Sequence, residues 1–398
     1  MGVAEDRLTL TEAARRVGVT PATLRRWARD GLVPKHDSNG WSSEAIGQAR
    51  TVARLRERGH SLNEIRQATE QGRLAYAYVE GLFPDGAGLY TLAEAARETG
   101  LEPALIERIV AAIGFPTRTD SLNEEDLQLM RYTATALDAG LPLVALLQLV
   151  RVYGQAAAQI ADAEVRLFHL YVHEPLMRSG SSGAEIAEDM MSLSRLLLPL
   201  ASPAMDQIHE RYLQHFIEQD IVGHMESDLN GAGADLGRIR VAIAFADLTG
   251  YTRLTEEAGE LEALDAVERF VDAVEGTLPD NARVVKMIGD EVMVVGTDPS
   301  ALIDWAVGFQ RLQSERPLPR IGIHYGDVLY RDGDYYGRDV NIAARIAARA
   351  AGREVLVTRP VVEHAGSHLE FDRIGEITLK GFTEPTEMFL AQVGDEDD

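Results

Sequence analysis

The pattern of apolar residues changes once along this 398-residue chain, and the change divides it into two parts that must fold differently. Residues 122–229 repeat apolar side chains at spacings of three and four, the pattern of amphipathic helices. Residues 230–237, rich in small side chains, indicate a linker. A continuous apolar run at 241–245 and further short runs then predict β-strands. We therefore expect a multidomain protein with an all-α N-terminal half and an α+β domain after it.

Composition limits the functions open to such a chain. Its 39 Lys and Arg against 63 Asp and Glu give a formal net charge of −24, which disfavours non-specific binding of nucleic acid or anionic lipid. The chain has no cysteine, which excludes disulfides, thiolate zinc sites and thiol catalysis. No stretch approaches 18 uninterrupted apolar residues. We expect a soluble, cytoplasmic protein with no membrane partner.

An internal repeat organises the first part of the chain. Residues 10–26 match residues 92–108 at an offset of 82, with nine identities in 17 positions. In each copy a helical pattern breaks at Gly18 or Gly100, and a second helix begins near Pro21 or Pro103. This spacing predicts two helix-turn-helix units.

The first unit continues through Leu32-Val33-Pro34, a Gly-containing segment around Trp41 and a helix that ends in GHSLNEIRQ (59–67). These features resemble the MerR family of winged helix-turn-helix proteins. The resemblance implies a first domain at residues 1–78, and residues 86–229 would then hold a second, winged-helix-like repeat and a helical regulatory region. The wing position reads Ser38-Asn39-Gly40-Trp41-Ser42, without the Arg and Tyr usual in that family.

Three arginines are candidates for DNA contact. Arg25, Arg26 and Arg29 lie within about one turn of the second predicted helix, where a recognition helix would present them. Residues 1–70 carry 12 Lys and Arg against 9 Asp and Glu, a local charge of +3. The alternative is a helical regulatory or dimerisation module that contacts no DNA, and the sequence leaves both open.

Five of the ten histidines fall in the helical middle region, which suggests a pH sensor. They are His169, His173, His209, His215 and His224. Surface histidines without a role, or an apolar ligand beside residues 196–198, are the alternatives. The order and composition of this region are similar to the helical regulatory regions found ahead of soluble actinobacterial nucleotide cyclases.

The last part of the chain predicts a βαββαβ order, which is the ferredoxin-like arrangement. We expect a strand at 241–245, a hairpin at 284–296 with a carboxylate at its tip, and two strands within 320–331. In that sheet the first strand lies beside the hairpin, so Asp247 and Asp290 should meet. Two such carboxylates suit a pair of Mg²⁺ ions that also bind substrate phosphate. Two turn aspartates with a capping role are the alternative.

Five motifs follow in order: FADLTGYT (245–252), KMIGDEVM (286–293), RIGIHYGDV (320–328), DYYGRDVNIAARI (334–346) and ITLKGF (377–382). Together they resemble the catalytic domain of class III adenylate and guanylate cyclases over residues 238–394. The resemblance makes Asp247, the backbone carbonyl of Leu248 and Asp290 the ligands of two Mg²⁺ or Mn²⁺ ions. Lys286 and Asp334 take the base-reading positions: the lysine meets adenine N1 and the aspartate meets the N6 amine, which implies ATP rather than GTP.

The same resemblance gives roles to three further residues. Asn341 would orient the ribose, Arg345 would neutralise charge on the α-phosphate, and Lys380 would hold the triphosphate. In this family the site lies across a head-to-tail dimer, so that a homodimer through the catalytic domain is implied. The expected reaction is attack of the ribose 3′-oxygen on the α-phosphorus, giving cyclic AMP and pyrophosphate. The rival function is a DNA-binding regulator that uses the cyclase domain as a nucleotide sensor or dimerisation device.

Overall fold

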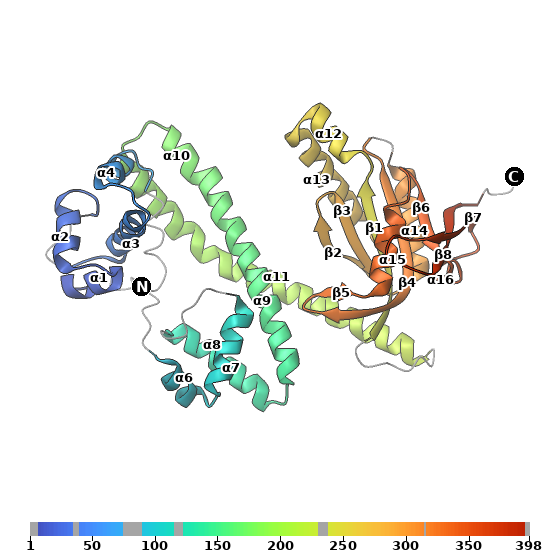
Figure 1. Cartoon of the computed structure of the whole chain (residues 1–398), viewed down its shortest axis with the longest axis horizontal. Coiled ribbons are helices and arrows are strands. Elements are labelled where there is room, and N and C mark those ends of the chain that lie inside the picture. The colour runs from blue at the N-terminus through green and yellow to red at the C-terminus, as the bar shows by residue number, and fades with distance from the viewer. Residues whose placement is uncertain are drawn as a thin grey trace. The chain divides into compact units, whose positions relative to one another are not determined.

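The structure is a computed structural model that describes residues 7–34, 40–74, 90–114, 122–229, 238–313 and 316–394. The chain divides into two compact units, Met1–Tyr212 and Leu213–Asp398. The first is helical and the second holds a β-sheet with helices on its faces (Figure 1). The linker predicted at 230–237 lies outside the described residues.

The first repeat is a helix-turn-helix, as predicted. Helix α1 (Leu10–Val17) begins at a capping box between Thr9 and Glu12 and ends at Gly18, whose φ of 79° is left-handed. Helix α2 (Pro21–Arg29) follows, and α3 (Ser43–Glu57) and α4 (Leu62–Glu70) complete the bundle. Glycine at such a helix end satisfies orphan carbonyl groups without Cβ strain. Residues 35–39 of the predicted wing lie outside the described residues.

The second repeat has the same local structure. Helices α6 (Leu92–Thr99) and α7 (Pro103–Ile113) are separated by Gly100, at φ 73°. An isolated antiparallel bridge joins Tyr90 to Leu122, as one joins Leu8 to Trp41 in the first repeat. The duplicated helix pairs are confirmed, whereas the described residues contain no wing hairpin in either copy.

The middle of the chain is helical, as the apolar spacing predicts. Its elements are α8 (Glu124–Asp138), α9 (Leu143–Phe168), the π-helical segment η1 (His169–His173), α10 (Glu174–Arg178) and α11 (Gly183–Leu229). Within the described residues, the stretch Leu143–Arg178 is long and apolar enough to cross a membrane, by length and composition alone. A core helix of a soluble protein passes the same test, and therefore the length and composition of this stretch do not by themselves show a membrane span.

The second unit contains an eight-stranded sheet. Its strands are β1 (Arg238–Leu248), β2 (Ala282–Ile288), β3 (Glu291–Gly296), β4 (Pro319–Arg331), β5 (Asp334–Tyr336), β6 (Val355–Thr358), β7 (Leu369–Thr378) and β8 (Pro385–Val393). The order is β2-β3-β1-β4-β6-β8-β7, with β5 paired to β4. The β2-β3-β1-β4 part is the predicted ferredoxin-like sheet. One detail was wrong: residues 320–331 form one strand, because β4 pairs with β1 without a break from Arg238↔Leu329 to Leu248↔Pro319.

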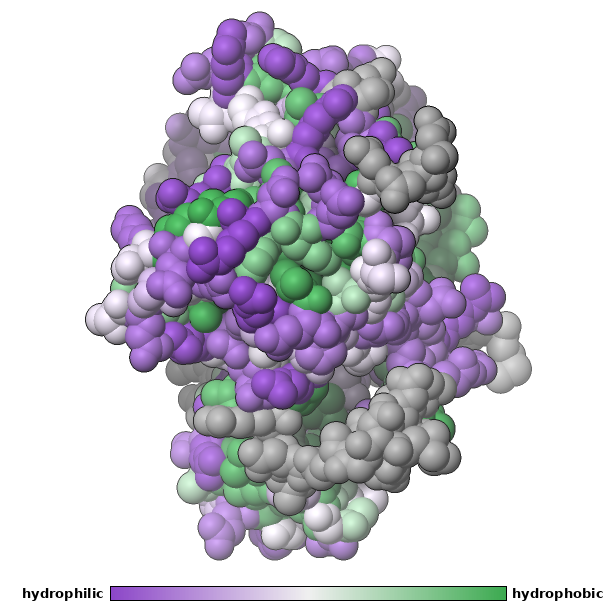
Figure 2. Space-filling view, turned by 90° about the vertical axis from the view of Figure 1, so that its right-hand side faces the viewer, coloured by the Kyte–Doolittle hydropathy of each residue, from purple (hydrophilic) through white to green (hydrophobic). Residues whose placement is uncertain are grey.

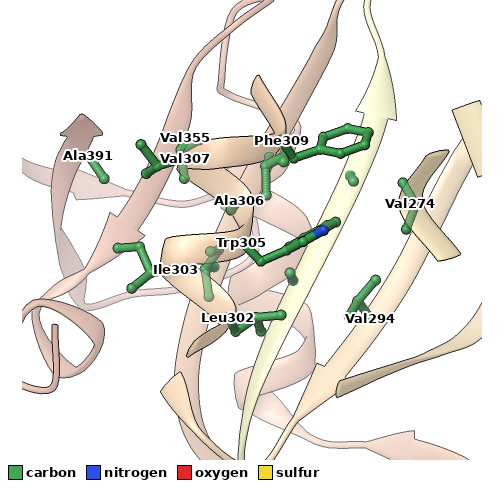
Figure 3. Close-up of a cluster of buried hydrophobic side chains, with 14 of the residues drawn as sticks. Val274, Val294, Leu302, Ile303, Trp305, Ala306, Val307, Phe309, Val355 and Ala391 are labelled. Carbon is green, nitrogen blue, oxygen red and sulfur yellow. The ribbon is translucent and has the colours of Figure 1, made fainter. Parts of the chain in front are cut away.

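Residues 241–248 of β1 are buried on both faces of the sheet, which explains the continuous apolar run. Its alanines Ala242, Ala244 and Ala246 leave room for α13 (Glu260–Thr277) and α14 (Pro299–Leu312). Figure 3 shows α14 in this core with Trp305 and Phe309, whose ring centroids are 5.4 Å apart. The larger side chains of β1 face α15 (Arg338–Ala347) on the opposite side of the sheet.

Two short helices, α12 (Tyr251–Ala258) and α16 (Arg359–Val362), complete this unit. Figure 2 shows a face on which hydrophilic residues predominate and apolar ones form separate areas, as expected for a net charge of −24.

Candidate active site

The two predicted metal aspartates converge at one end of the sheet. Asp247 is near the end of β1, paired in register with Glu291 at the start of β3, and Asp290 precedes Glu291 in the β2–β3 turn. That turn requires a left-handed residue, which Gly289 provides at φ 68°. Burial, then the charge of Asp247 and a hydrogen bond with it, raises the pKa of Asp290 to about 6. The pair therefore carries excess negative charge.

The sequence analysis missed a positively charged side chain, Arg320, that forms an ion pair with Asp247. Arg320, at the start of β4, donates from Nε to Asp247 Oδ2 at 2.8 Å and forms a second contact through Nη2. Its Nη1 donates to the Ala348 carbonyl at 3.2 Å. Arg320 stands in the RIGIHYGDV motif, but only the pairing Asp247↔Arg320 across β1 and β4 brings the two together.

Glu291 is a third acidic residue near the pair. Burial first, and then the negative charge of Asp247, raises the pKa of the Glu291 carboxyl group. Leu248 is 4% exposed, and its apolar side chain is in the core, so that its backbone carbonyl is the group it can offer a metal. No cluster of three or more His, Cys, Asp or Glu side chains with metal-binding geometry occurs among the described residues. The oxygen ligands present fit a hard cation that completes its coordination with substrate phosphate and water.

The predicted base-reading residues contact each other. Lys286 on β2 forms an ion pair with Asp334 at the start of β5. The Asp334 carboxylate also accepts a hydrogen bond from the Tyr335 backbone N–H at 2.8 Å. Arg283 on β2 donates to the Tyr335 hydroxyl at 3.2 Å, which adds a second contact between the strands. A donor and an acceptor thus lie side by side, the pattern that would complement the adenine edge.

The remaining predicted residues lie on and beside α15. Asn341 is exposed and donates from Nδ2 to the Gly337 carbonyl at 3.1 Å. Arg345, one turn later, and Lys380, just after β7, line the same cavity of about 240 Å³. Two cationic side chains over one cavity suit polyphosphate. A larger cavity of about 540 Å³, lined by α14, β6 and β8, contains none of these side chains.

The arginines considered for DNA contact are on the outer surface of the first unit. Arg25, Arg26 and Arg29 are all exposed on α2, and Arg29 forms an ion pair with Asp30 at 3.2 Å. The corresponding helix α7 carries exposed Glu107, and its N-cap residue is exposed Glu102. The two helix pairs therefore differ in surface charge.

The sheet order and the meeting of Asp247 with Asp290 beside the β2–β3 hairpin are the arrangement expected of a nucleotide cyclase domain. Family models agree: the adenylate and guanylate cyclase catalytic domain matches residues 238–392, and the adenylate cyclase regulatory domain matches residues 39–217. The MerR family regulatory protein model matches residues 9–41.

The chain is 30% identical to an adenylate cyclase from Streptomyces coelicolor, over 72% of this chain and 74% of that protein. It is 27% identical to a pH-sensitive adenylate cyclase from Mycobacterium tuberculosis, over 87% of this chain and 88% of that protein. Among solved structures, adenylyl cyclase CyaB from P. aeruginosa is 20% identical with a TM-score of 0.37, covering 40% of this chain and 97% of that one. The chain belongs to the class III adenylate cyclase family, with a regulatory domain ahead of the catalytic domain.

Proposed function

We propose that the protein converts ATP to 3′,5′-cyclic AMP and pyrophosphate, and that Asp247 and Asp290 are essential to the reaction. The observation that carries the proposal is their convergence, with the pKa of Asp290 raised to about 6 by burial and by Asp247. Such a site binds cations readily. Two Mg²⁺ or Mn²⁺ ions held by these carboxylates and the Leu248 carbonyl would supply acidity to the ribose 3′-hydroxyl and stabilise the leaving pyrophosphate.

The residues of the chain position the nucleotide. Lys286 would donate to adenine N1 and Asp334 would accept from the N6 amine, which selects ATP. Asn341 would orient the ribose, and Arg345 and Lys380 would neutralise phosphate charge. Electrostatic stabilisation of this kind is usually the largest contribution to such catalysis. The shared cavity of Arg345 and Lys380 supports the assignment.

We further propose that the active species is a homodimer in which each site takes its metal aspartates from one chain and its base- and phosphate-binding residues from the other. Large apolar side chains on the strands beside the base-reading pair are about half exposed, which supports a protein partner there. They are Ile239, Met287, Ile288, Leu329, Tyr330 and Tyr336. A monomer would then be inactive.

Residues 1–78 and 86–229 would regulate the catalytic domain at 238–394. The π-helical segment η1 supports pH as one signal: His173 is 6% exposed, and its Nδ1 lies 3.2 Å from that of His169. The relative from M. tuberculosis is named pH-sensitive. We also propose a cytoplasmic location. The long apolar stretch contains an Asp162–Arg166 ion pair of 2.7 Å, which membrane-spanning helices rarely tolerate, and this supports a protein that does not cross the membrane.

The experiment is an assay of the purified full-length protein with ATP and Mg²⁺ or Mn²⁺, with cyclic AMP and pyrophosphate measured as products. Asp290→Ala should lower the rate by at least ~10²-fold through loss of charge stabilisation. Asp304→Asn, a surface carboxylate on α14, is the matched control and should keep the wild-type rate. An Asp290→Ala variant with normal activity would refute the metal assignment.

A second candidate function is DNA binding by the first unit, supported by the MerR match at residues 9–41 and by the exposed Arg25, Arg26 and Arg29. Binding through these side chains should weaken steeply with salt, because condensed counterions are released. Selection from a random duplex library at low salt tests this function. A library that yields no enriched sequence would leave α1 to α4 as a regulatory module.

A further inference from the structure

Helix α15, which carries Asn341 and Arg345, lies directly on strand β4. Two glycines of β4 make this close approach possible. A Cβ atom at Gly322 would overlap the backbone of Ala347, and one at Gly326 would overlap the carboxylate of Asp339. Both glycines face α15 because residues two and four apart on a strand share one side of the sheet. The position of α15 is therefore determined by its contact with this side of β4.

Between the two glycines, and on the same side of β4, lies His324. Its side chain is 8% exposed, and its Nδ1 shares a hydrogen bond of 2.8 Å with the Thr358 hydroxyl at the end of β6. Thr358 is 1% exposed. On the other side of the ring, Nε2 lies 3.6 Å from Asp339 Oδ1 in the first turn of α15. The Nδ1–Thr358 contact is thus a hydrogen bond, whereas the Nε2–Asp339 contact has the length of an ion pair.

Asp339 makes a second contact with β4. Its Oδ2 accepts a hydrogen bond of 2.8 Å from the backbone N–H of Asp327, close to where β4 begins to pair with β5. The contact with His324 is the largest of the causes that lower the pKa of the Asp339 carboxyl group, and the Asp327 N–H and Arg338 add to it. Asp339 is therefore held as an anion by groups inside the domain.

We propose that Thr358, His324 and Asp339 form a positioning latch that fixes α15 and the β4–β5 hairpin relative to each other. The latch would set the distance between Arg345 and Asn341 on the helix and Asp334 on the hairpin, and none of its three residues would contact the substrate. These two groups of side chains act on opposite ends of one nucleotide, the phosphates and the base, so that their spacing decides whether the ribose 3′-oxygen is aligned. The assignment rests on the proposed ATP cyclisation.

The test compares three variants of the full-length protein: Asp339→Asn, His324→Gln and the double variant. Asp339→Asn keeps an acceptor for the Asp327 N–H and removes the charge. Misplacement of catalytic groups by about 1 Å costs up to ~10²-fold. We expect each single variant to lower kcat by about 10- to 100-fold while KM for ATP changes less than about threefold. Because the two residues act through one contact, the double variant should be no slower than the slower single variant.

The matched control is the other His–Asp contact of this domain, between His368 and Asp304 at 2.9 Å, where both side chains are exposed. Asp304→Asn should leave kcat and KM unchanged. Amide hydrogen exchange supplies a readout that does not need activity: the amides of α15 should exchange faster in Asp339→Asn than in wild type, and those of α14 should not. Thr358→Val is the milder variant if His324→Gln fails to fold, and it should act in the same direction.

Additive effects of His324→Gln and Asp339→Asn, a change in KM alone, or unchanged exchange in α15 would each overturn the latch. Absence of cyclic AMP from the wild-type protein would refute the proposed function instead, and hydrogen exchange would still decide whether the three residues hold α15.

Discussion

At the scale of single residues, the charges of Asp247, Asp290 and Arg320 depend on one another. Arg320 neutralises Asp247, and Asp290 carries the remaining excess charge, with a pKa of about 6. In the proposed function a divalent ion would bind the carboxylate form of Asp290, so that protons would compete with the ion below that pKa. In the metal-free protein the raised pKa also means that the favourable contribution of protonated Asp290 is lost as pH rises through about 6.

This balance predicts how metal activation depends on pH. The Mn²⁺ concentration that gives half-maximal activity should rise by about tenfold between pH 7 and pH 5, because one proton must leave Asp290. Activity at saturating ATP, measured over a series of free Mn²⁺ concentrations at each pH, gives this value. A half-maximal concentration that is the same at both pH values would contradict the assignment of Asp290.

The Lys286–Asp334 pair makes a prediction about base choice. Lys286→Glu removes the donor for adenine N1 and places a second carboxylate beside Asp334. A site built to hydrogen-bond one base rejects another by ~10²-fold or more when buried polar groups are left unpaired. Turnover of ATP should therefore fall sharply and the ATP to GTP preference should shrink. Steady-state kcat/KM for both nucleotides measures the effect, and an unchanged ratio would exclude these residues as the base readers.

At the scale of elements, the π-helical segment η1 places a titratable ring where charge is unfavourable. Burial is the main cause that lowers the pKa of His173 below its ordinary 6.5, with a smaller contribution of the same sign from His169. A hydrogen bond with the Gly72 backbone and the negative charge of Glu174 oppose this shift of the pKa. Because the folded state holds His173 neutral below its ordinary pKa of 6.5, the unfolded state takes up a proton first, and stability falls as pH drops below about 6.5.

We therefore expect the helical region to lose stability between pH 7.5 and pH 5.5, and His173→Gln to lose less over the same interval. Thermal unfolding of full-length protein at the two pH values measures this difference. His209→Gln, an exposed position on α11, is the control and should behave as wild type. If all three proteins lose the same stability, His173 is not the titrating group. If wild type and His173→Gln show the same dependence of cyclase activity on pH, His173 is not a regulatory switch.

At the scale of the whole molecule, the dimer proposal predicts complementation. Asp247→Ala and Arg345→Ala should each be inactive alone. In an equal mixture half of the dimers are heterodimers, and each has one intact site, so that about one quarter of wild-type activity should return. Cyclic AMP formation after subunit exchange, with exchange verified by differently tagged chains, measures the recovery. No recovery in verified heterodimers would mean that each site is built within one chain.

Much of this architecture could be predicted from the sequence because the relevant signals are local. Apolar spacing gives the helices of the first unit, and Gly18 and Gly100 give the turns of both repeats, since a helix end and its cap depend on neighbouring residues. The βαββαβ order and the meeting of Asp247 with Asp290 also follow, because a two-strand hairpin beside β1 fixes which strand ends coincide. The two strands predicted within 320–331 are one strand, whose continuity comes from its pairing with β1.

Other features depend on tertiary structure alone. Nothing local in RIGIHYGDV shows that Arg320 meets Asp247, since they are 73 positions apart and are joined by the order of β1 and β4. The sequence analysis gave Asp339 no role, whereas in the structure it contacts His324 and accepts a hydrogen bond from the Asp327 N–H. The sequence determined which groups are present and the local element that carries each one. The sheet order and the close packing of α15 decided which of them touch, because partners that distant in the chain are selected by the whole fold.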